Sequence, residues 1–139
     1  MYQGACAARS NESAPSNMYR MSTTLDTSQP LNSWNVSKVE SMRGMFDNAR
    51  SFNQPLNSWD VSKVEDMRLM FQFAGSFNQP LDNWDVSSVE TMRAMFFAAY
   101  SFNQPLNNWD VSNVVNMRTM FRGATSFDRA AYAPWYNGE

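Results

Sequence analysis

Apolar and polar positions along this chain change their spacing within a pattern that returns every 25 residues. In the stretch that begins at Leu56, the apolar residues Trp59 and Val61 alternate with polar Ser58 and Asp60. Alternation of this kind is typical of a strand that is buried on one face. The pattern therefore predicts a short strand that begins at Leu56.

The stretch that follows has the spacing of a helix. Its apolar residues lie at intervals of three and four, on one helical face: Val64, Met67, Met70, Phe71 and Ala74. Ser62 followed three residues later by Glu65 forms a capping box, and Gly75 is placed to end the helix. The pattern therefore predicts one short helix after each strand.

Both patterns belong to an internal repeat. Tryptophans and arginines each recur every 25 residues, at Trp34, Trp59, Trp84 and Trp109 and at Arg43, Arg68, Arg93 and Arg118. The tract Phe-Asn-Gln-Pro-Leu occurs at 52–56, 77–81 and 102–106. An unbroken spacing through three intervals is strong evidence for repeated structural units, because a single insertion would destroy it.

These features predict an α/β repeat solenoid of the leucine-rich-repeat kind, with one short parallel strand and one short helix per coil. A β-helix-like solenoid is the alternative. We expect residues 29–127 to form four coils whose Trp, Val, Met, Phe, Ala and Leu rows make the core. Residues 1–28 are expected to be an N-terminal tail and degenerate cap, and residues 128–139 a C-terminal cap.

Three tracts of the repeat resemble a known family. In the third unit they are 77–81, 84–89 and 92–99, which are similar to the F-N-Q-x-[LI], W-[DN]-x-S-x-V and M-x-x-M-F-x-x-A tracts of BspA-like leucine-rich-repeat proteins. The resemblance is strongest to the mycoplasma lipoprotein branch, and it covers roughly residues 29–127. It implies an adhesion or recognition protein that is secreted or lies at the cell surface, and it brings no catalytic residues.

Composition argues against several classes of function. The net charge of −2 gives no long-range attraction for nucleic acid or for an anionic membrane. The chain has no histidine and one cysteine, Cys6, so the commonest general base and every Ser–His or Cys–His nucleophile are missing. Residues 1–17 contain no apolar run long enough for a membrane helix. We expect no enzyme, no cofactor, no nucleic-acid partner and no membrane insertion.

Charged and amide residues also form rows through the repeat. The arginines are expected to pair with Asp60, Asp85 and Asp110 or with Glu40, Glu65 and Glu90. The aspartates have the oxygen ligands that calcium prefers, but we expect them to cap turns or pair with arginine, so no metal site is predicted. The amides Asn53, Asn78, Asn103, Gln54, Gln79 and Gln104 are expected to be buried and to satisfy backbone groups from one coil to the next.

The outward positions of the predicted strands form the candidate binding face, because solenoids use such extended faces for recognition. Its residues are Asn57, Ser58, Asp60, Ser62, Lys63, Asp82, Asn83, Asp85, Ser87, Asn107, Asn108, Asp110, Ser112 and Asn113. The face is polar and has no aromatic anchor, which favours a weak or polar ligand such as a glycan. We expect a non-enzymatic module that binds a protein or a glycan.

The alternative is a structural or spacer element without a specific ligand. An open stack of repeats exposes apolar surface at each end unless a cap covers it. At the C-terminal end, Tyr132, Trp135 and Tyr136 supply rings that could cover the last coil. Both expected caps are short, so weak end-to-end association of chains is a second hypothesis.

Overall fold

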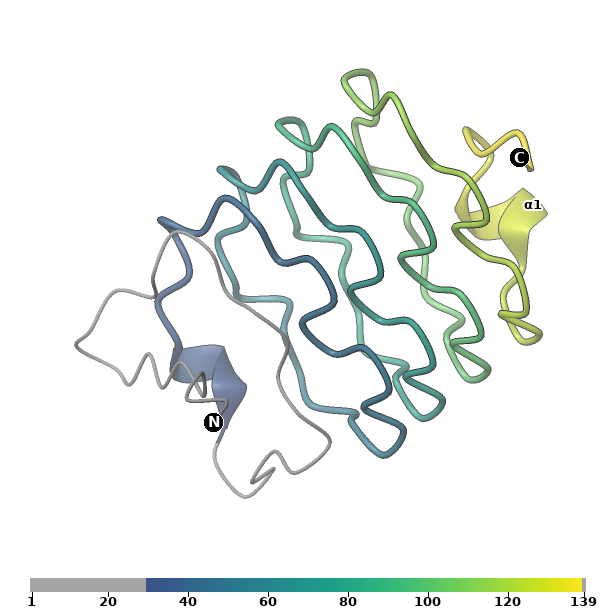
Figure 1. Ribbon diagram of the computed structural model, residues 1–139, viewed down its shortest axis with the longest axis horizontal. Coiled ribbons are helices and arrows are strands. Elements are labelled where there is room, and N and C mark those ends of the chain that lie inside the picture. Colours follow the sequence, from purple (N-terminus) through teal and green to yellow (C-terminus); the bar gives the residue numbers. More distant parts are fainter. Residues whose placement is uncertain (1–29, 139) are drawn as a thin grey trace, which may run out of the picture.

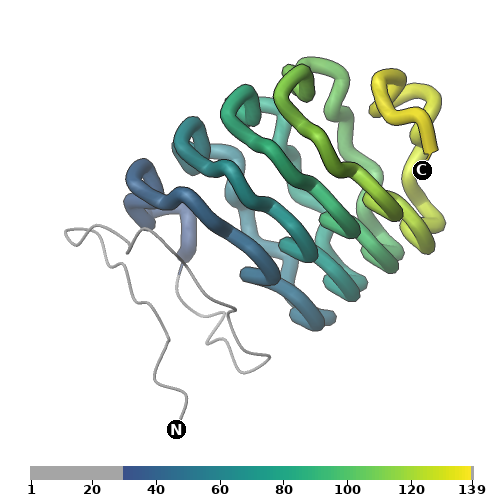
Figure 2. The backbone as a smooth tube through the Cα atoms, turned by 45° about the horizontal axis from the view of Figure 1, so that its top comes forward, coloured from purple at the N-terminus to yellow at the C-terminus, as the bar shows by residue number. Residues whose placement is uncertain are grey.

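The computed structural model describes residues 30–138 of the chain. These residues wind into a row of coils that lie side by side along the sequence (Figure 1). A second view shows the same stack, with the C-terminal segment lying over the last coil (Figure 2). The predicted N-terminal tail and cap, residues 1–28, falls outside the described residues.

The predicted α/β leucine-rich-repeat fold is wrong. The described residues contain only two helical elements, the 3-10 helix η1 at Leu31–Ser33 and helix α1 at Arg129–Tyr132. Neither element lies where the apolar spacing predicted the helix of a coil. The β-helix-like alternative is also wrong, because residues 30–138 form no sheet and pair only through isolated parallel bridges.

A series of tight turns takes the place of each predicted helix. In the first coil, the N–H of Met45 donates to the carbonyl oxygen of Met42 at 3.2 Å. The third residue of that turn, Gly44, has a φ of 62°, and Asn48 has a φ of 61° in the turn that starts at Phe46. A left-handed residue at the third position is typical of a type II turn, and one at every fourth residue interrupts an α-helix.

The same two positions are left-handed in the later coils. Their residues are Leu69, Phe73, Ala94, Ala98, Thr119 and Gly123. Chained four-residue turns bring residues three and four apart to the same side. They therefore reproduce the apolar spacing that the sequence pattern attributed to a helix.

Backbone hydrogen bonds join each turn segment to the next coil, and we call this set of bonds the ladder. In the second coil, the N–H groups of Met67, Leu69, Phe71 and Phe73 donate to third-coil carbonyl oxygens at 2.8–3.0 Å. The first and third coils donate from the equivalent residues, which are Met42, Gly44, Phe46, Asn48, Met92, Ala94, Phe96 and Ala98. All of these N–H groups point toward the C-terminal end of the stack.

Turn formation explains why the ladder bonds share one direction. The carbonyl oxygens of Met67, Leu69 and Phe71 accept from residues three positions later in their own coil, at 3.0–3.3 Å. These oxygens are therefore used within the coil. A bond in the opposite direction links Glu65 N–H to the Glu40 oxygen at 2.8 Å, and its equivalents repeat in the next two coils.

Side chains join the coils where strands were predicted. Residues 56–62 make no backbone-to-backbone hydrogen bond to a neighbouring coil in the described structure. Instead, the indole Nε1 of Trp59 donates to the Leu31 carbonyl oxygen at 2.8 Å, and that of Trp84 to the Leu56 oxygen at 2.9 Å. The backbone pairing thus lies in the predicted helix segment, and the predicted strand segment is held by tryptophan.

The core consists of columns of like side chains, one from each coil. Phe71 is fully buried, and its ring centroid lies 5.4 Å from those of Phe46 and Phe96. The ring of Phe77 lies closer still, at 4.1 Å. Most members of the Trp, Val, Met, Phe, Ala and Leu rows are buried, as the sequence predicted.

Residues after the fourth coil cover part of the C-terminal end. Helix α1 is capped by Asp128, whose carboxylate accepts from the N–H of Ala131 at 3.1 Å. Trp135 stacks on Trp109 with ring centroids 6.4 Å apart. Tyr136 packs edge-on against Phe121 at 5.2 Å, so these rings extend the aromatic columns of the stack.

Candidate functional site

The predicted binding face lies along the turns on either side of each tryptophan. Its residues are exposed, except that Asn57, Ser62 and Ser87 are half-buried. Because the described residues form no strand here, the face is built from turn residues and not from the outward side of a sheet.

Each aspartate at the centre of this face holds a local turn. The Oδ1 atom of Asp60 accepts from the Ser62 hydroxyl at 2.6 Å and from the Ser62 N–H at 3.1 Å. Similar contacts occur at Asp85–Ser87 and at Asp110–Ser112. Hydrogen bonds from the serine hydroxyl and N–H hold the pKa of Asp60 and of Asp110 below the ordinary value. Turn capping, one of the two roles predicted for these aspartates, is confirmed.

Other members of the face bond to the neighbouring coil. The amide of Asn57 donates to Asp82 Oδ1 at 3.1 Å and accepts from the N–H of Asn83 at 3.0 Å. Asn113 donates to the carbonyl oxygen of Ser87 at 2.7 Å. These side chains stabilise the stack, so less of the polar face is free for a ligand than the sequence suggested.

The amide row links successive coils, as predicted. The side-chain oxygen of Asn53 accepts from the N–H of Asn78 at 2.9 Å, and that of Asn78 accepts from Asn103 at 2.9 Å. Asn103 in turn accepts from the N–H of Asp128 at 3.0 Å, and Gln79 donates to the Asn53 carbonyl oxygen at 3.2 Å. The predicted burial is wrong, since Asn53 is exposed and the other two asparagines are half-buried.

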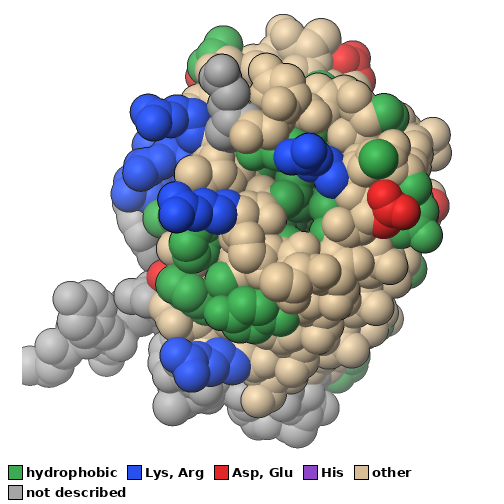
Figure 3. All heavy atoms as spheres, turned by 90° about the vertical axis from the view of Figure 1, so that its right-hand side faces the viewer, with side chains coloured by type: hydrophobic (Ala, Val, Ile, Leu, Met, Phe, Trp, Pro, Cys, Tyr) green, Lys and Arg blue, Asp and Glu red, His purple; other side chains and the backbone are tan. Residues whose placement is uncertain are grey.

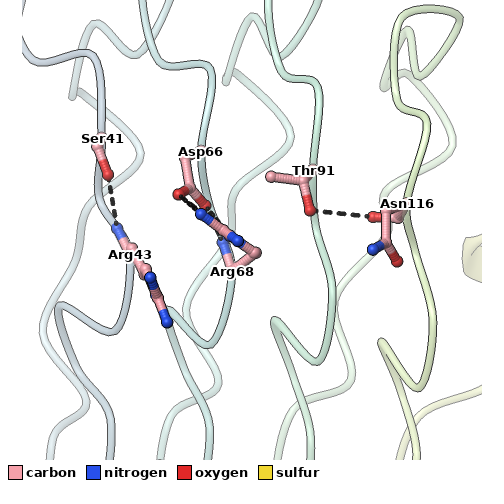
Figure 4. Close-up of polar contacts among 6 residues, drawn as sticks. All are labelled: Ser41, Arg43, Asp66, Arg68, Thr91 and Asn116. Carbon is pink, nitrogen blue, oxygen red and sulfur yellow. Dashed lines mark hydrogen bonds and ion pairs between the residues drawn. The ribbon is translucent and has the colours of Figure 1, made fainter.

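Arg68 has a different partner from those that the sequence suggested. Its Nη2 lies 2.6 Å from Oδ2 of Asp66 (Figure 4). Burial raises the pKa of the Asp66 carboxyl, but hydrogen bonds from Arg68 outweigh it and leave that pKa below its ordinary value. The position of Asp66 is occupied by Ser41, Thr91 and Asn116 in the other coils (Figure 4). This ion pair therefore belongs to one coil and is not a repeated feature.

Residues 30–138 hold no group of three or more acidic or cysteine side chains placed to bind a metal ion. Among the same residues, no helix is long and apolar enough to cross a bilayer.

The turn-capping aspartates are the part of the predicted chemistry that the structure repeats from coil to coil. They are Asp60, Asp85 and Asp110, and we call them the aspartate row.

The sequence prediction missed a second surface, at the C-terminal end of the stack. A hollow of about 630 Å³ there is lined by Phe121, Phe127 and Tyr136, with Arg122 and Arg129 among its other residues. Figure 3 shows apolar side chains exposed in this end face, with basic side chains around them.

A second hollow of about 400 Å³ lies along the preceding residues of the same coil. Val115, Met117, Arg118 and Trp135 help to line it. One sequence signal pointed here, because Val115 occupies the position at which the earlier coils carry glutamate.

Comparison of the chain with curated proteins and with solved structures finds no significant match. A family model described as "Mycoplasma protein of unknown function, DUF285" matches residues 15–135, which is most of the sequence. The chain therefore belongs to the DUF285 family of Mycoplasma proteins of unknown function.

Proposed function

We propose that this chain is a non-enzymatic interaction module that binds a protein or a glycan through the aspartate row. The observation that supports the proposal most directly is the repetition of one exposed carboxylate in three successive coils. Each is held in a similar turn by the serine two residues later. A partner would therefore meet carboxylates whose positions are fixed before binding, which lowers the entropy lost on association.

The free oxygens of the row define the chemistry of the partner. Asp60 uses Oδ1 for its turn, and Oδ2 accepts no hydrogen bond from a described residue. The tryptophans next to the row stack with ring centroids 6.4–6.5 Å apart from one coil to the next. Ammonium or guanidinium groups, or sugar hydroxyls, that repeat on a similar scale would match the row. A long polymer or an extended basic surface fits better than a single small molecule.

We also propose that the module acts at the cell surface or after secretion. The resemblance of the 77–81, 84–89 and 92–99 tracts to BspA-like surface proteins supports this location. An adhesion role would be consistent with a row of polar contacts, each weak alone and effective together.

A spacer without a specific ligand is the second candidate. The specific observation in its favour is the number of face side chains that bond between coils, such as Asn57 and Asn113. A face whose amides mainly stabilise the stack needs no ligand to account for its composition.

We expect the change of Asp60, Asp85 and Asp110 together to asparagine to weaken partner binding about tenfold or more while the fold is kept. Asparagine should preserve the turn, because Asn35 in the first coil accepts from the Ser37 hydroxyl at 2.7 Å and N–H at 3.2 Å. Binding is measured against a glycan array and against purified surface proteins, with dissociation constants determined for each hit.

The matched control changes Glu40, Glu65 and Glu90 to glutamine, which removes the same charge from another exposed row. We expect this variant to bind like the parent chain. Equal affinity of the aspartate variant and the parent for every ligand would contradict the proposal. Absence of any ligand for well-folded parent protein would favour the spacer.

A further inference from the structure

The ladder leaves a row of donors at the C-terminal end of the stack. Third-coil N–H groups donate to the carbonyl oxygens of the fourth coil at 2.8–3.0 Å. The equivalent N–H groups of the fourth coil belong to Met117, Thr119, Phe121 and Gly123. None of these four has a hydrogen-bond partner among residues 30–138. The last coil is therefore an open edge that is ready to pair with one more chain segment.

The open edge runs along both hollows of the end face. Residues 114–118 line one hollow and residues 119–124 contribute to the other, and the C-terminal segment supplies Trp135 and Tyr136. We call the two hollows and the edge together the terminal groove. Because the groove runs along the edge of the last coil, its shape suits an extended chain segment. Its hollows provide room for the side chains of that segment.

The terminal groove exposes apolar side chains whose equivalents in the earlier coils are buried or are replaced by polar residues. Val115 is 87% exposed, whereas the equivalent residues of the earlier coils are glutamates. Met117 is half-buried, whereas its equivalents Met42 and Met67 are fully buried. Covering such side chains would contribute about 25 cal/mol per Å² of apolar surface, so the groove favours an occupant with apolar side chains.

The charge of the groove restricts the occupant further. An edge that presents mainly N–H groups carries partial positive charge, as the N-terminus of a helix does. Arg118, Arg122 and Arg129 add full positive charges, and the nearby Asp128 already caps α1. Two copies related by a two-fold axis at this edge would place donors against donors and arginines against arginines, which is repulsive.

We propose that the terminal groove binds an extended acidic segment of a partner protein. Carbonyl oxygens of the segment accept from the N–H groups of Thr119, Phe121 and Gly123, so that the partner adds one rung to the ladder. Its carboxylates pair with Arg122 and Arg129, and its apolar side chains cover the exposed Val115 and the half-buried Met117. This surface is separate from the aspartate row, so either proposal can fail without the other.

The probe is a blocked eight-residue peptide in which glutamate alternates with valine and a central phenylalanine replaces one valine. It is titrated into the ¹⁵N-labelled full chain, and amide chemical shifts are followed. We expect the resonances of Thr119, Phe121 and Gly123 to move downfield, because each N–H gains an acceptor. Changing both Arg122 and Arg129 to glutamate should weaken binding about tenfold or more. Exchanging Arg43 and Arg93 for glutamate is the matched control and should leave binding unchanged.

Several results would overturn this proposal. These are no shift at about millimolar peptide, equal binding of a peptide with lysine in place of glutamate, or shifts confined to the aspartate row. If the arginine variant does not melt like the parent, the affinity of the parent chain for the peptide is measured at rising salt instead. Charge pairing requires this affinity to fall as salt rises, and an unchanged affinity would overturn the proposal. A second copy of the chain would be the occupant instead if the mass measured by sedimentation rose with chain concentration and the amides of Thr119, Phe121 and Gly123 became protected from hydrogen exchange.

Discussion

Replacing Phe71 by alanine should lower the free energy of unfolding by about 3–5 kcal/mol. The side chain is fully buried, and its ring contacts those of Phe46, Phe77, Trp84 and Phe96. Truncation removes apolar burial and leaves a gap between rings that belong to three coils. A loss of this size is a large fraction of the roughly 5–15 kcal/mol that stabilises a typical domain. Urea unfolding followed by tryptophan fluorescence measures it.

Tyr100 provides the matched control for this aromatic truncation. Its side chain is 52% exposed, so Tyr100→Ala should cost about 1 kcal/mol or less. Similar unfolding midpoints for the two variants would mean that the aromatic column does not form the core.

Changing Leu69 to proline should destabilise the fold by about 3 kcal/mol or more. Leu69 has a φ of 61°, and its N–H donates to the Arg93 carbonyl oxygen at 3.0 Å. Proline fixes φ near −65° and has no N–H, so both the turn and one bond of the ladder are lost. Unfolding midpoints in urea give the difference from the parent chain.

Leu69→Ala separates the backbone effect from loss of the side chain. Alanine keeps the N–H, and Ala94 adopts the same left-handed conformation at the equivalent position, with a φ of 53°. Because Leu69 is only half-buried, we expect this variant to lose about 1 kcal/mol. If proline and alanine destabilised the chain equally, neither the left-handed turn nor the ladder bond at Leu69 would contribute measurably to stability.

The sequence predicted which residues form the core, but it did not predict the backbone that buries them. Spacings of three and four at Met67, Met70 and Phe71 suit a helix and a chain of four-residue turns equally well. Glycine at every left-handed position would have distinguished the chain of turns from a helix. Gly44 does so in the first coil, but Leu69 and Ala94 occupy the same position later, and neither indicates a positive φ.

Local features of the candidate site were easier to predict than features that depend on stacking. The Asp-x-Ser pattern around Asp60 places an acceptor two residues before an N–H, so turn capping follows from sequence alone. The pairing of Arg68 with Asp66 depends on which neighbour the turn brings close. The terminal groove exists because the ladder has an end, and Val115 was its one sign in the repeat pattern.

Turns joined by a one-directional ladder replace the helices of the expected solenoid. Gly44 is the best position at which to test this backbone, because it has a φ of 62° and an added Cβ would meet only Asp47 Cβ, at an ordinary 3.8 Å. The measurement is the free energy of unfolding of Gly44→Ala against the parent, with Ala94→Gly as the reciprocal exchange. We expect Gly44→Ala to be less stable by about 1–2 kcal/mol, the cost of a left-handed alanine. A gain of about 1 kcal/mol, as expected for glycine to alanine inside a helix, would contradict it.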